Sequence, residues 1–191
     1  MTPWREIQLP MSAETVASLK AGDKVILYGT IYTARDAAHK RFIETLDRGE
    51  KLPIDLESAV IYYMGPSPTR PGDIIGACGP TTSARMDKYT PRLIEQGLRV
   101  MMGKGNRSPE VVEAIKQQGA VYLVTIGGAG ALLSLKVRDC QVVAYSDLGA
   151  EAVLKLEVVN FPAIVAVDSQ GNDLCEIGPA RYRTVDKGGL K

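Results

Sequence analysis

The sequence predicts an α/β fold with a mixed sheet flanked by helices, and three observations indicate this class. The second half of the chain alternates between short β-branched stretches and longer stretches that end at glycine. Hydrophobic residues make up 45% and charged residues 24% of the sequence, which is typical of a globular domain. A length of 191 residues is enough for one domain with a substantial core. We therefore expect an N-terminal arm over residues 1–20, one domain over residues 21–180 and a polar tail over residues 181–191.

The first half of the chain predicts short elements separated by turns. Thr33, with Asp36 three residues later, resembles a capping box at the start of a helix. Pro91 either kinks the helix that Ser83 caps or restarts it with Thr90 as a new cap. The expected elements are a helix over 13–19, a strand over 24–30, a helix from Thr33 to Gly49, short strands in 57–65 and 74–80 around a hairpin-like loop at 66–73, and a helix over 84–96.

The second half predicts a more regular alternation. Ser108 and Pro109 are typical of a helix start, and Gly119 is typical of a helix end. The expected elements are a strand at 98–106 that enters a glycine-rich turn, a helix over 108–118, a strand at 121–133 that ends in a small-residue turn, a strand at 140–146, a helix over 148–158 and a strand at 161–172.

Charge and hydropathy exclude several classes of protein. The net charge of +1 lacks the basic excess of DNA-binding proteins. No apolar run approaches the roughly 20 residues of a membrane span. The opening MTPWREIQLP has charges and a proline where a signal peptide has its apolar core. We expect a cytoplasmic protein with neither a nucleic-acid nor a membrane partner.

Cysteine and histidine are scarce. Cys78, Cys140 and Cys175 are widely spaced without a CxxC pair, so we expect no metal site made by this chain alone. Each is more typical of a small buried hydrophobe. His39 is the single histidine, so any catalytic triad would depend on it.

Two glycine motifs fail the spacing of nucleotide-binding loops. IGGAGAL follows a predicted strand but lacks the G-x-G-x-x-G pattern, and GLRVMMGKGN has five residues between its first two glycines where a P-loop has four. IGGAGAL is either a tight turn that allows close packing or a backbone cradle for a substrate carboxylate.

Basic residues stand at unusual positions. Arg35 is expected in the first turn of its helix, where a cation is unfavourable unless an anion binds there. The alternative is a solvated arginine paired with Asp36 or Glu44. His39, four residues on, is expected on the same face, and taken alone it is more typical of a structural histidine.

Hydroxyl groups cluster after the Gly79-Pro80 turn. Simple helix capping explains one of the hydroxyls of Thr81, Thr82 and Ser83 but not all three. Arg85 follows one turn later, and Lys104 stands uncrowded between two glycines. With Arg35, these two cations form a set suited to binding a small dicarboxylate, if the fold brings them together.

Five segments carry a resemblance to a known family. GTIYTARDAAHKR, GPTTSARMD, GKGN, GGAGAL and LGAEAVLKLEVVNFPAIVAVD occur in this order. Together they resemble the C-terminal domain, or β subunit, of the class I iron–sulfur hydro-lyases, which are fumarases and L-tartrate dehydratases. The similarity runs from about Gly22 to Asp173, and GPTTSARMD and RDAAHKR are its specific parts.

The resemblance implies a fold, a cofactor and a partner. The family domain is a swivelling β/β/α domain. Its [4Fe–4S] cluster is ligated by cysteines of an N-terminal domain or a separate α subunit, and the active site forms between the halves. For this chain, the resemblance implies an α-subunit partner that carries the cluster, an α2β2-type assembly and a small dicarboxylate substrate.

The resemblance also implies roles for individual residues. Thr81 matches the catalytic base, and Arg35, Arg85 and Lys104 match residues that bind the substrate. A threonine needs a nearby carboxylate, a cation or a dry site to act as a base. The supporting residues are Gly79, His39, Thr82 and Asp87. Asp87 is one candidate for the carboxylate partner of Thr81, and a carboxylate supplied by the partner chain is the other.

Three functions remain open from the sequence. TARDAAHKR, GGAGAL and LEVVNFPAIVAVD favour a fumarase over a tartrate dehydratase, although tartrate dehydratase β subunits share GPTTS and GKG. An alternative of another class is a non-catalytic dicarboxylate-binding module. A nucleotide-binding enzyme is the third alternative, although neither glycine motif has the spacing of a nucleotide-binding loop.

Overall fold

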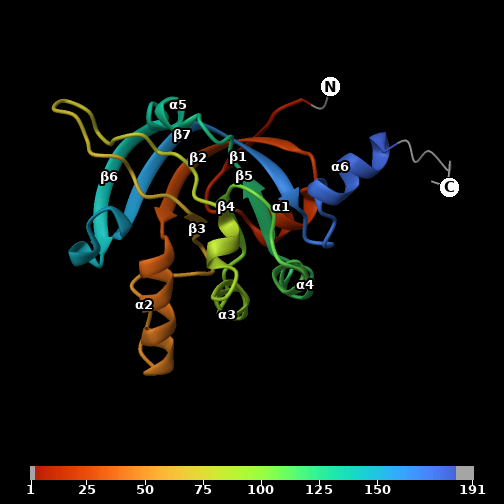
Figure 1. The fold of residues 1–191 in the computed structure, drawn as a ribbon, viewed down its shortest axis with the longest axis horizontal. Helices are drawn as coiled ribbons and strands as arrows, with labels where there is room; N and C mark the ends of the chain where they lie inside the picture. Colours follow the sequence, from red (N-terminus) through yellow and green to blue (C-terminus); the bar gives the residue numbers. More distant parts are fainter. Residues whose placement is uncertain (1–2, 184–191) are drawn as a thin grey trace, which may run out of the picture.

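The computed structural model describes residues 3–183 and contains one seven-stranded mixed sheet that closes on itself (Figure 1). Strands β2 to β5 run parallel in chain order. Strand β7 pairs antiparallel with both β5 and β2 and so closes the ring, while β1 and β6 extend β2 and β7. The strands are β1 (Arg5–Gln8), β2 (Lys24–Thr33), β3 (Val60–Tyr62), β4 (Val100–Gly103), β5 (Val121–Val124), β6 (Val137–Ala144) and β7 (Val153–Val167). The predicted mixed α/β class is confirmed.

Helices cover one side of this partly closed barrel. In Figure 1, α2, α3 and α4 lie together below the sheet, and α5 lies on the opposite side. No helix within residues 3–183 is long and apolar enough to cross a membrane. The helices are α1 (Ala13–Ser18), α2 (Asp36–Asp47), α3 (Thr90–Glu95), α4 (Pro109–Gln118), α5 (Gly130–Ser134) and α6 (Leu174–Tyr182), with 3-10 turns η1 (Ser83–Met86) and η2 (Ser146–Glu151).

The two faces of the sheet bury separate cores, because successive side chains of a strand point to opposite faces. Tyr62 of β3 lies inside the barrel with Phe161, their rings 5.6 Å apart. Its neighbours Ile61 and Tyr63 lie in the second core, between the sheet and the helices, together with Phe42 of α2. Both faces of the parallel strands are therefore buried, as expected for a sheet with helices on its outer side.

The expected helix over 148–158 is wrong. Residues from Val153 onward belong to β7, and only η2 precedes them. Leu154, Leu156 and Val158 are buried, whereas Lys155 and Glu157 between them are partly exposed. This is the period of two of a strand, which the Ala, Leu and Glu content of the segment obscured.

The expected capping box is also wrong. Thr33 is the last residue of β2, where its hydroxyl accepts a hydrogen bond from the Leu154 backbone N–H at 3.1 Å. Arg35 occupies the cap position of α2. Ser83 does not cap a helix either, because it lies inside η1. Pro91 restarts the chain as α3, one of the two alternatives for this segment, but the expected Thr90 cap is wrong, because Tyr89 occupies the cap position and Thr90 is the first residue of the helix.

Other expectations are confirmed or corrected locally. Ser67 and Ala77 close the hairpin-like loop through a backbone hydrogen bond of 3.2 Å, but residues 74–80 form only a bridge and no strand. Strand β1 was not expected, and with α1 it lies inside the predicted arm and contributes Ile7 to the core. Tyr182 of the predicted tail lies in α6, and residues 184–191 lie outside the described part of the chain. The division at residues 20 and 180 stays a prediction.

Candidate functional site

The predicted site residues meet where the parallel strands end. Arg35 follows β2 by two residues, and Lys104 follows β4 directly. Thr81 joins the end of β3 through a 2.6 Å hydrogen bond from its backbone N–H to the Tyr63 carbonyl. Because the carboxyl ends of parallel strands share one edge of a sheet, this edge is the usual place for a binding site in an α/β fold.

The hydroxyl segment lies alongside the lysine loop. The Lys104 N–H donates to the Thr81 carbonyl at 3.2 Å, and the Ser83 N–H donates to the Lys104 carbonyl at 2.9 Å. Thr82 and Lys104 form a parallel bridge. A Cβ atom on Gly103 would collide with the Ser83 Oγ, so only glycine allows this approach. Thr81 is partly buried and Thr82 is exposed.

The two arginines meet around the beginning of α2. Arg85 donates from Nε to Asp36 Oδ1 at 3.0 Å, and its Nη2 lies 2.8 Å from Oδ2 of the same carboxylate. Arg35 Nη2 lies 3.7 Å from Glu151 Oε1, and Arg35 Nε is buried and finds no hydrogen-bond partner among residues 3–183. The alternative in which Arg35 pairs with Asp36 or Glu44 is wrong, because Asp36 pairs with Arg85 and Glu44 lies 3.7 Å from Lys40.

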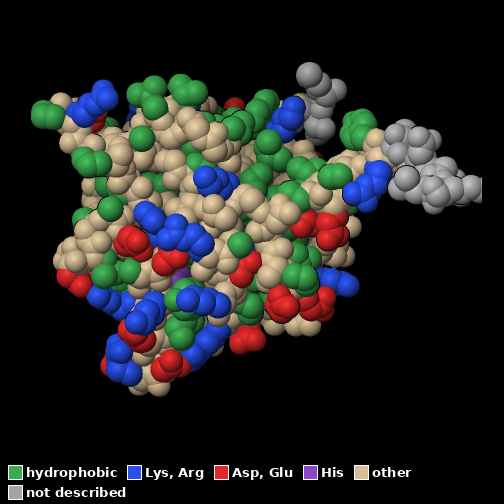
Figure 2. Space-filling view, in the orientation of Figure 1, with side chains coloured by type: hydrophobic (Ala, Val, Ile, Leu, Met, Phe, Trp, Pro, Cys, Tyr) green, Lys and Arg blue, Asp and Glu red, His purple; other side chains and the backbone are tan. Residues whose placement is uncertain are grey.

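The edge carries an excess of positive charge that is accessible to solvent. The Arg85 side chain is 49% exposed and the Arg35 side chain is 23% exposed, and each pairs with a different carboxylate. Lys104 makes no salt bridge with any other residue of 3–183. Figure 2 shows a group of Lys and Arg side chains over the upper end of α2, with acidic side chains beside it. Guanidinium groups in this setting can exchange a protein carboxylate for that of a ligand.

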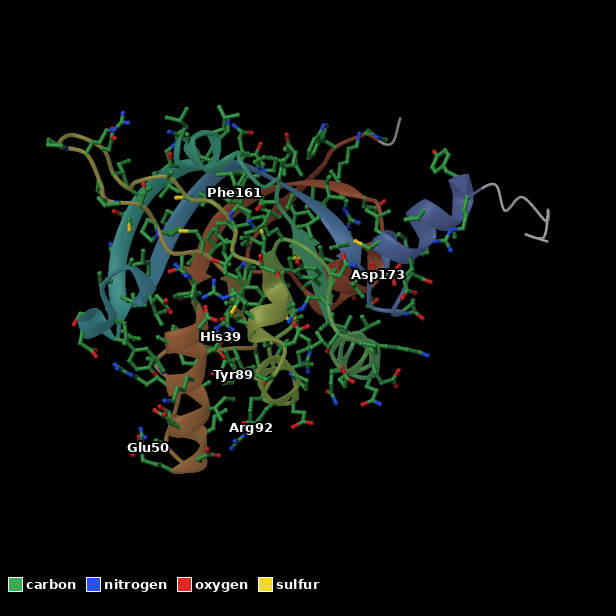
Figure 3. The ribbon with its side chains drawn as sticks, in the orientation of Figure 1. His39, Glu50, Tyr89, Arg92, Phe161 and Asp173 are labelled. Atoms are coloured by element: carbon green, nitrogen blue, oxygen red, sulfur yellow. The ribbon has the colours of Figure 1, made fainter. Side chains whose placement is uncertain are left out.

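His39 supports the arginine from below. Its ring is fully buried and its Nδ1 lies 2.9 Å from the Arg35 carbonyl, so Nδ1 carries the proton and donates. The His39 and Tyr63 rings pack edge to face with their centroids 5.2 Å apart. Tyr89, labelled beside His39 in Figure 3, stacks on His39 with ring centroids 6.1 Å apart. Burial, together with nearby Arg107, lowers the pKa of His39 to about 4, although the hydrogen bond to the Arg35 carbonyl opposes the shift. His39 is therefore neutral and contacts the Arg35 backbone.

Two further predicted residues have structural contacts. Asp87 accepts from Arg107 Nε at 2.8 Å and from the Ser108 N–H at 2.7 Å, so its carboxylate binds the loop after β4 and forms no hydrogen bond with Thr81. At Gly79 the chain passes so close to α5 that a Cβ atom on Gly130 would lie 2.8 Å from the Gly79 nitrogen. IGGAGAL thus permits close packing, one of its two interpretations.

Three further residues of this region, Arg107, Tyr63 and Glu151, were not expected from the sequence. Arg107 stands directly before the Ser108-Pro109 helix start, and that position was its only signal. Glu151 was hidden by the wrong helix over 148–158; its Oε2 accepts from the Ala37 N–H at 2.9 Å in the first turn of α2.

The chain does not gather the ligands of a metal cluster within residues 3–183. No three His, Cys, Asp or Glu side chains lie together there. Cys78 is buried, Cys140 is half-buried and Cys175 is exposed, so the expectation of a buried cysteine is correct for Cys78 and wrong for Cys175.

The family model and the similar proteins that this chain matches agree on one family. The model of the family described as "Fumarase C-terminus" matches residues 3–177. The aerobic class I fumarate hydratase of Escherichia coli (strain K12) is 43% identical over 175 residues, 90% of this chain and 31% of that protein. Fumarate hydratase 2 of Leishmania major is 40% identical over 163 residues, 84% of this chain and 29% of that protein.

A shorter relative matches over nearly its whole length. A Methanocaldococcus jannaschii protein, provisionally named L(+)-tartrate dehydratase subunit beta, is 43% identical over 172 residues. The match covers 87% of this chain and 88% of that protein. By contrast, the chain spans about 30% of the length of the fumarate hydratases that it matches.

Proposed function

This chain belongs to the fumarase C-terminal family, and we propose that it is the β half of a class I fumarate hydratase. Its reaction is the reversible hydration of fumarate to L-malate. The observation that carries the proposal is the group of Arg35, Arg85 and Lys104 beside Thr81 at the carboxyl ends of the strands. L-Tartrate dehydration is the second candidate, because the relative named for it matches along nearly its whole length.

The proposed division of labour follows the positions of the side chains. Arg35 and Arg85 bind the substrate carboxylates, and Asp36 and Glu151 hold the two guanidinium groups until the substrate arrives. Thr81 moves the proton at the carbon next to the hydroxyl-bearing carbon. Lys104 is paired with Thr81 through its backbone N–H, and a cation close to the Thr81 hydroxyl would favour its deprotonated form.

The proposal includes a partner that carries a [4Fe–4S] cluster, since the described cysteines of this chain do not form a site for one. When bound, the cluster supplies a Lewis acid for the substrate hydroxyl. The partner is an α subunit or a linked N-terminal half in a cytoplasmic assembly, of the α2β2 type if separate chains are involved.

An apolar surface next to the site supports a partner. Ile126, Leu132 and Leu135 are between 66% and 69% exposed, and they lie in or beside the α5 segment that packs against Gly79. Figure 2 shows hydrophobic side chains along the upper edge of the molecule, where Figure 1 places α5. Several exposed apolar side chains in one segment beside a polar site are typical of an interface. We name this group the α5 surface.

The test is an anoxic assay of malate and tartrate dehydration. It compares this chain alone, the chain with its cluster-bearing partner, and the same mixture with Thr81→Val or Arg85→Ala. Activity only in the mixture supports the proposal, and the preferred diacid decides between the two enzymes. We expect Thr81→Val to lower kcat and Arg85→Ala to lower kcat/KM, each by about 100-fold or more. No activity with an intact cluster would favour a non-catalytic dicarboxylate-binding module.

A further inference from the structure

Arg107 is a buried charged residue that the proposed reaction does not use. Its side chain is 0% exposed. Nε donates to Asp87 at 2.8 Å, Nη2 donates to Thr90 Oγ1 at 2.8 Å, and Nη1 donates to the Tyr63 hydroxyl at 3.2 Å. Its guanidinium group also lies over the rings of Tyr63 at 5.3 Å and Tyr122 at 4.9 Å.

The partners of Arg107 come from segments that carry the candidate site. Asp87 follows η1, which contains Arg85, and Thr90 begins α3 just beyond it. Arg107 itself lies in the loop that begins with Lys104. The carboxylate of Asp87 binds both Arg107 and the Ser108 N–H, so this ion pair joins η1 to the loop that begins with Lys104. The Asp87 side chain is only 11% exposed.

Tyr63 connects this contact to the other site segments. Its carbonyl accepts from the Thr81 N–H, its hydroxyl accepts from Arg107, and its ring packs edge to face with that of His39. His39 in turn holds the carbonyl of Arg35. One buried set of contacts therefore reaches every segment that carries a candidate catalytic or binding residue.

A second contact repeats the connection. The Tyr122 hydroxyl lies 2.7 Å from Ser83 Oγ and donates to the Gly105 carbonyl at 2.9 Å. Tyr122 thus joins the start of η1 to the lysine loop on the other side of Lys104, while its ring packs on Arg107.

We propose that Arg107 is a positioning residue that holds the Thr81–Arg85 segment against the Lys104 loop and so sets the spacing of the substrate-binding cations. The effect on catalysis rests on the proposed function. The contact between the two segments is a property of this chain alone. Arginine suits this role because its planar fork reaches three acceptors at once and stacks on two rings. A lysine could keep the charge and satisfy only part of the set.

The first experiment measures amide hydrogen exchange, residue by residue, on the whole chain. It compares the wild type with Arg107→Lys, and uses Arg92→Lys as the matched control because Arg92 pairs with Asp47 on the surface. We expect about tenfold faster exchange or more at the Ser83 and Lys104 amides in Arg107→Lys, with unchanged exchange in β5, because local opening accelerates exchange only where contacts are lost. Unchanged exchange at both amides would overturn the proposal.

A second variant covers the case in which Arg107→Lys does not fold. Tyr63→Phe removes one acceptor of Arg107 and keeps the ring that packs on His39. Faster exchange at Ser83 and Lys104 in this variant supports the proposal, and wild-type exchange overturns it.

The second experiment uses the assembled enzyme. We expect Arg107→Lys to lower kcat/KM at least tenfold, while Arg92→Lys stays within twofold of the wild type. A wild-type kcat/KM for Arg107→Lys would overturn the positioning role. The wild-type assembly could dehydrate neither diacid while Arg107→Lys still speeds exchange at the Ser83 and Lys104 amides. In that case the proposed function is wrong, and the structural role of Arg107 is supported.

Discussion

Acidification should weaken the fold through His39, which is the only histidine of the chain and is fully buried. Its ring is enclosed by Phe42, Tyr63 and Tyr89, and no group offers its Nε2 a partner within residues 3–183. A proton on Nε2 would therefore place a charge in an apolar site near the Arg107 guanidinium. The Arg35 carbonyl and Asp36 offset this cost only in part.

The size and sign of the effect follow from the pKa. Burial lowers the pKa of His39 from its ordinary value of 6.5 to about 4. The unfolded chain then binds a proton that the folded chain refuses, so stability is fully present above pH 6.5 and is lost as the pH falls toward 4. The gap between the two pKa values corresponds to a loss of about 3 kcal/mol, accumulated at up to about 1.4 kcal/mol per pH unit.

The assay is urea unfolding of the wild type and His39→Asn at intervals from pH 7.5 to pH 4. Asparagine keeps a donor that can reach the Arg35 carbonyl but does not titrate. Carboxylates also titrate at the acid end, so the quantity of interest is the difference in unfolding free energy between the two proteins. We expect the wild-type advantage at pH 7.5 to shrink by about 3 kcal/mol by pH 4. A difference independent of pH would refute the reasoning.

Two further predictions test the packing of the site and its apolar border. Gly103→Ala should lower stability by about 1–3 kcal/mol, because its new methyl group would collide with Ser83. Thermal unfolding measures this, and Gly178→Ala, whose Cβ has open space, is the control; equal melting temperatures would contradict the prediction. Replacing Leu132 and Leu135 by serine should leave the melting temperature of the chain unchanged but weaken binding to the cluster-bearing partner at least tenfold. Sedimentation measures this binding, and wild-type affinity would remove the α5 surface from the interface.

Local chemistry made much of the fold predictable. The helix at Pro109–Gln118 has a serine before its proline and a glycine after its last residue, and the structure has these bounds. Strand β7 was half missed because VLKLEVV contains good helix formers, yet it pairs with three other strands. Long-range pairing outweighed local propensity there, and only the alternation of Leu154, Leu156 and Val158 indicated it.

The residues of the candidate site also differ in how far local sequence could identify them. Thr81, Arg85 and Lys104 lie in segments with unusual local chemistry, so their selection did not need a structure. Arg107 and Glu151 are ordinary residues in the sequence, and their importance comes from partners that are distant in the chain. Tyr63 lies 44 positions from Arg107, and a periodicity of two or 3.6 residues carries no information on such contacts.

The course of strand β7 also constrains when the protein can fold during its synthesis. Lys24 near the beginning of the chain pairs with Ile164 near its end, and β5 pairs with the last residues of the same strand. A ribosome-bound chain that has emerged only through residue 150 therefore has β2 and β5 with open edges. Such edges pair readily with other chains, and contacts of this sequence separation form slowly. The ribosome synthesises Arg35, Arg85 and Lys104 well before β7, the strand that closes the barrel. We therefore expect folding to finish only after β7 has left the ribosome.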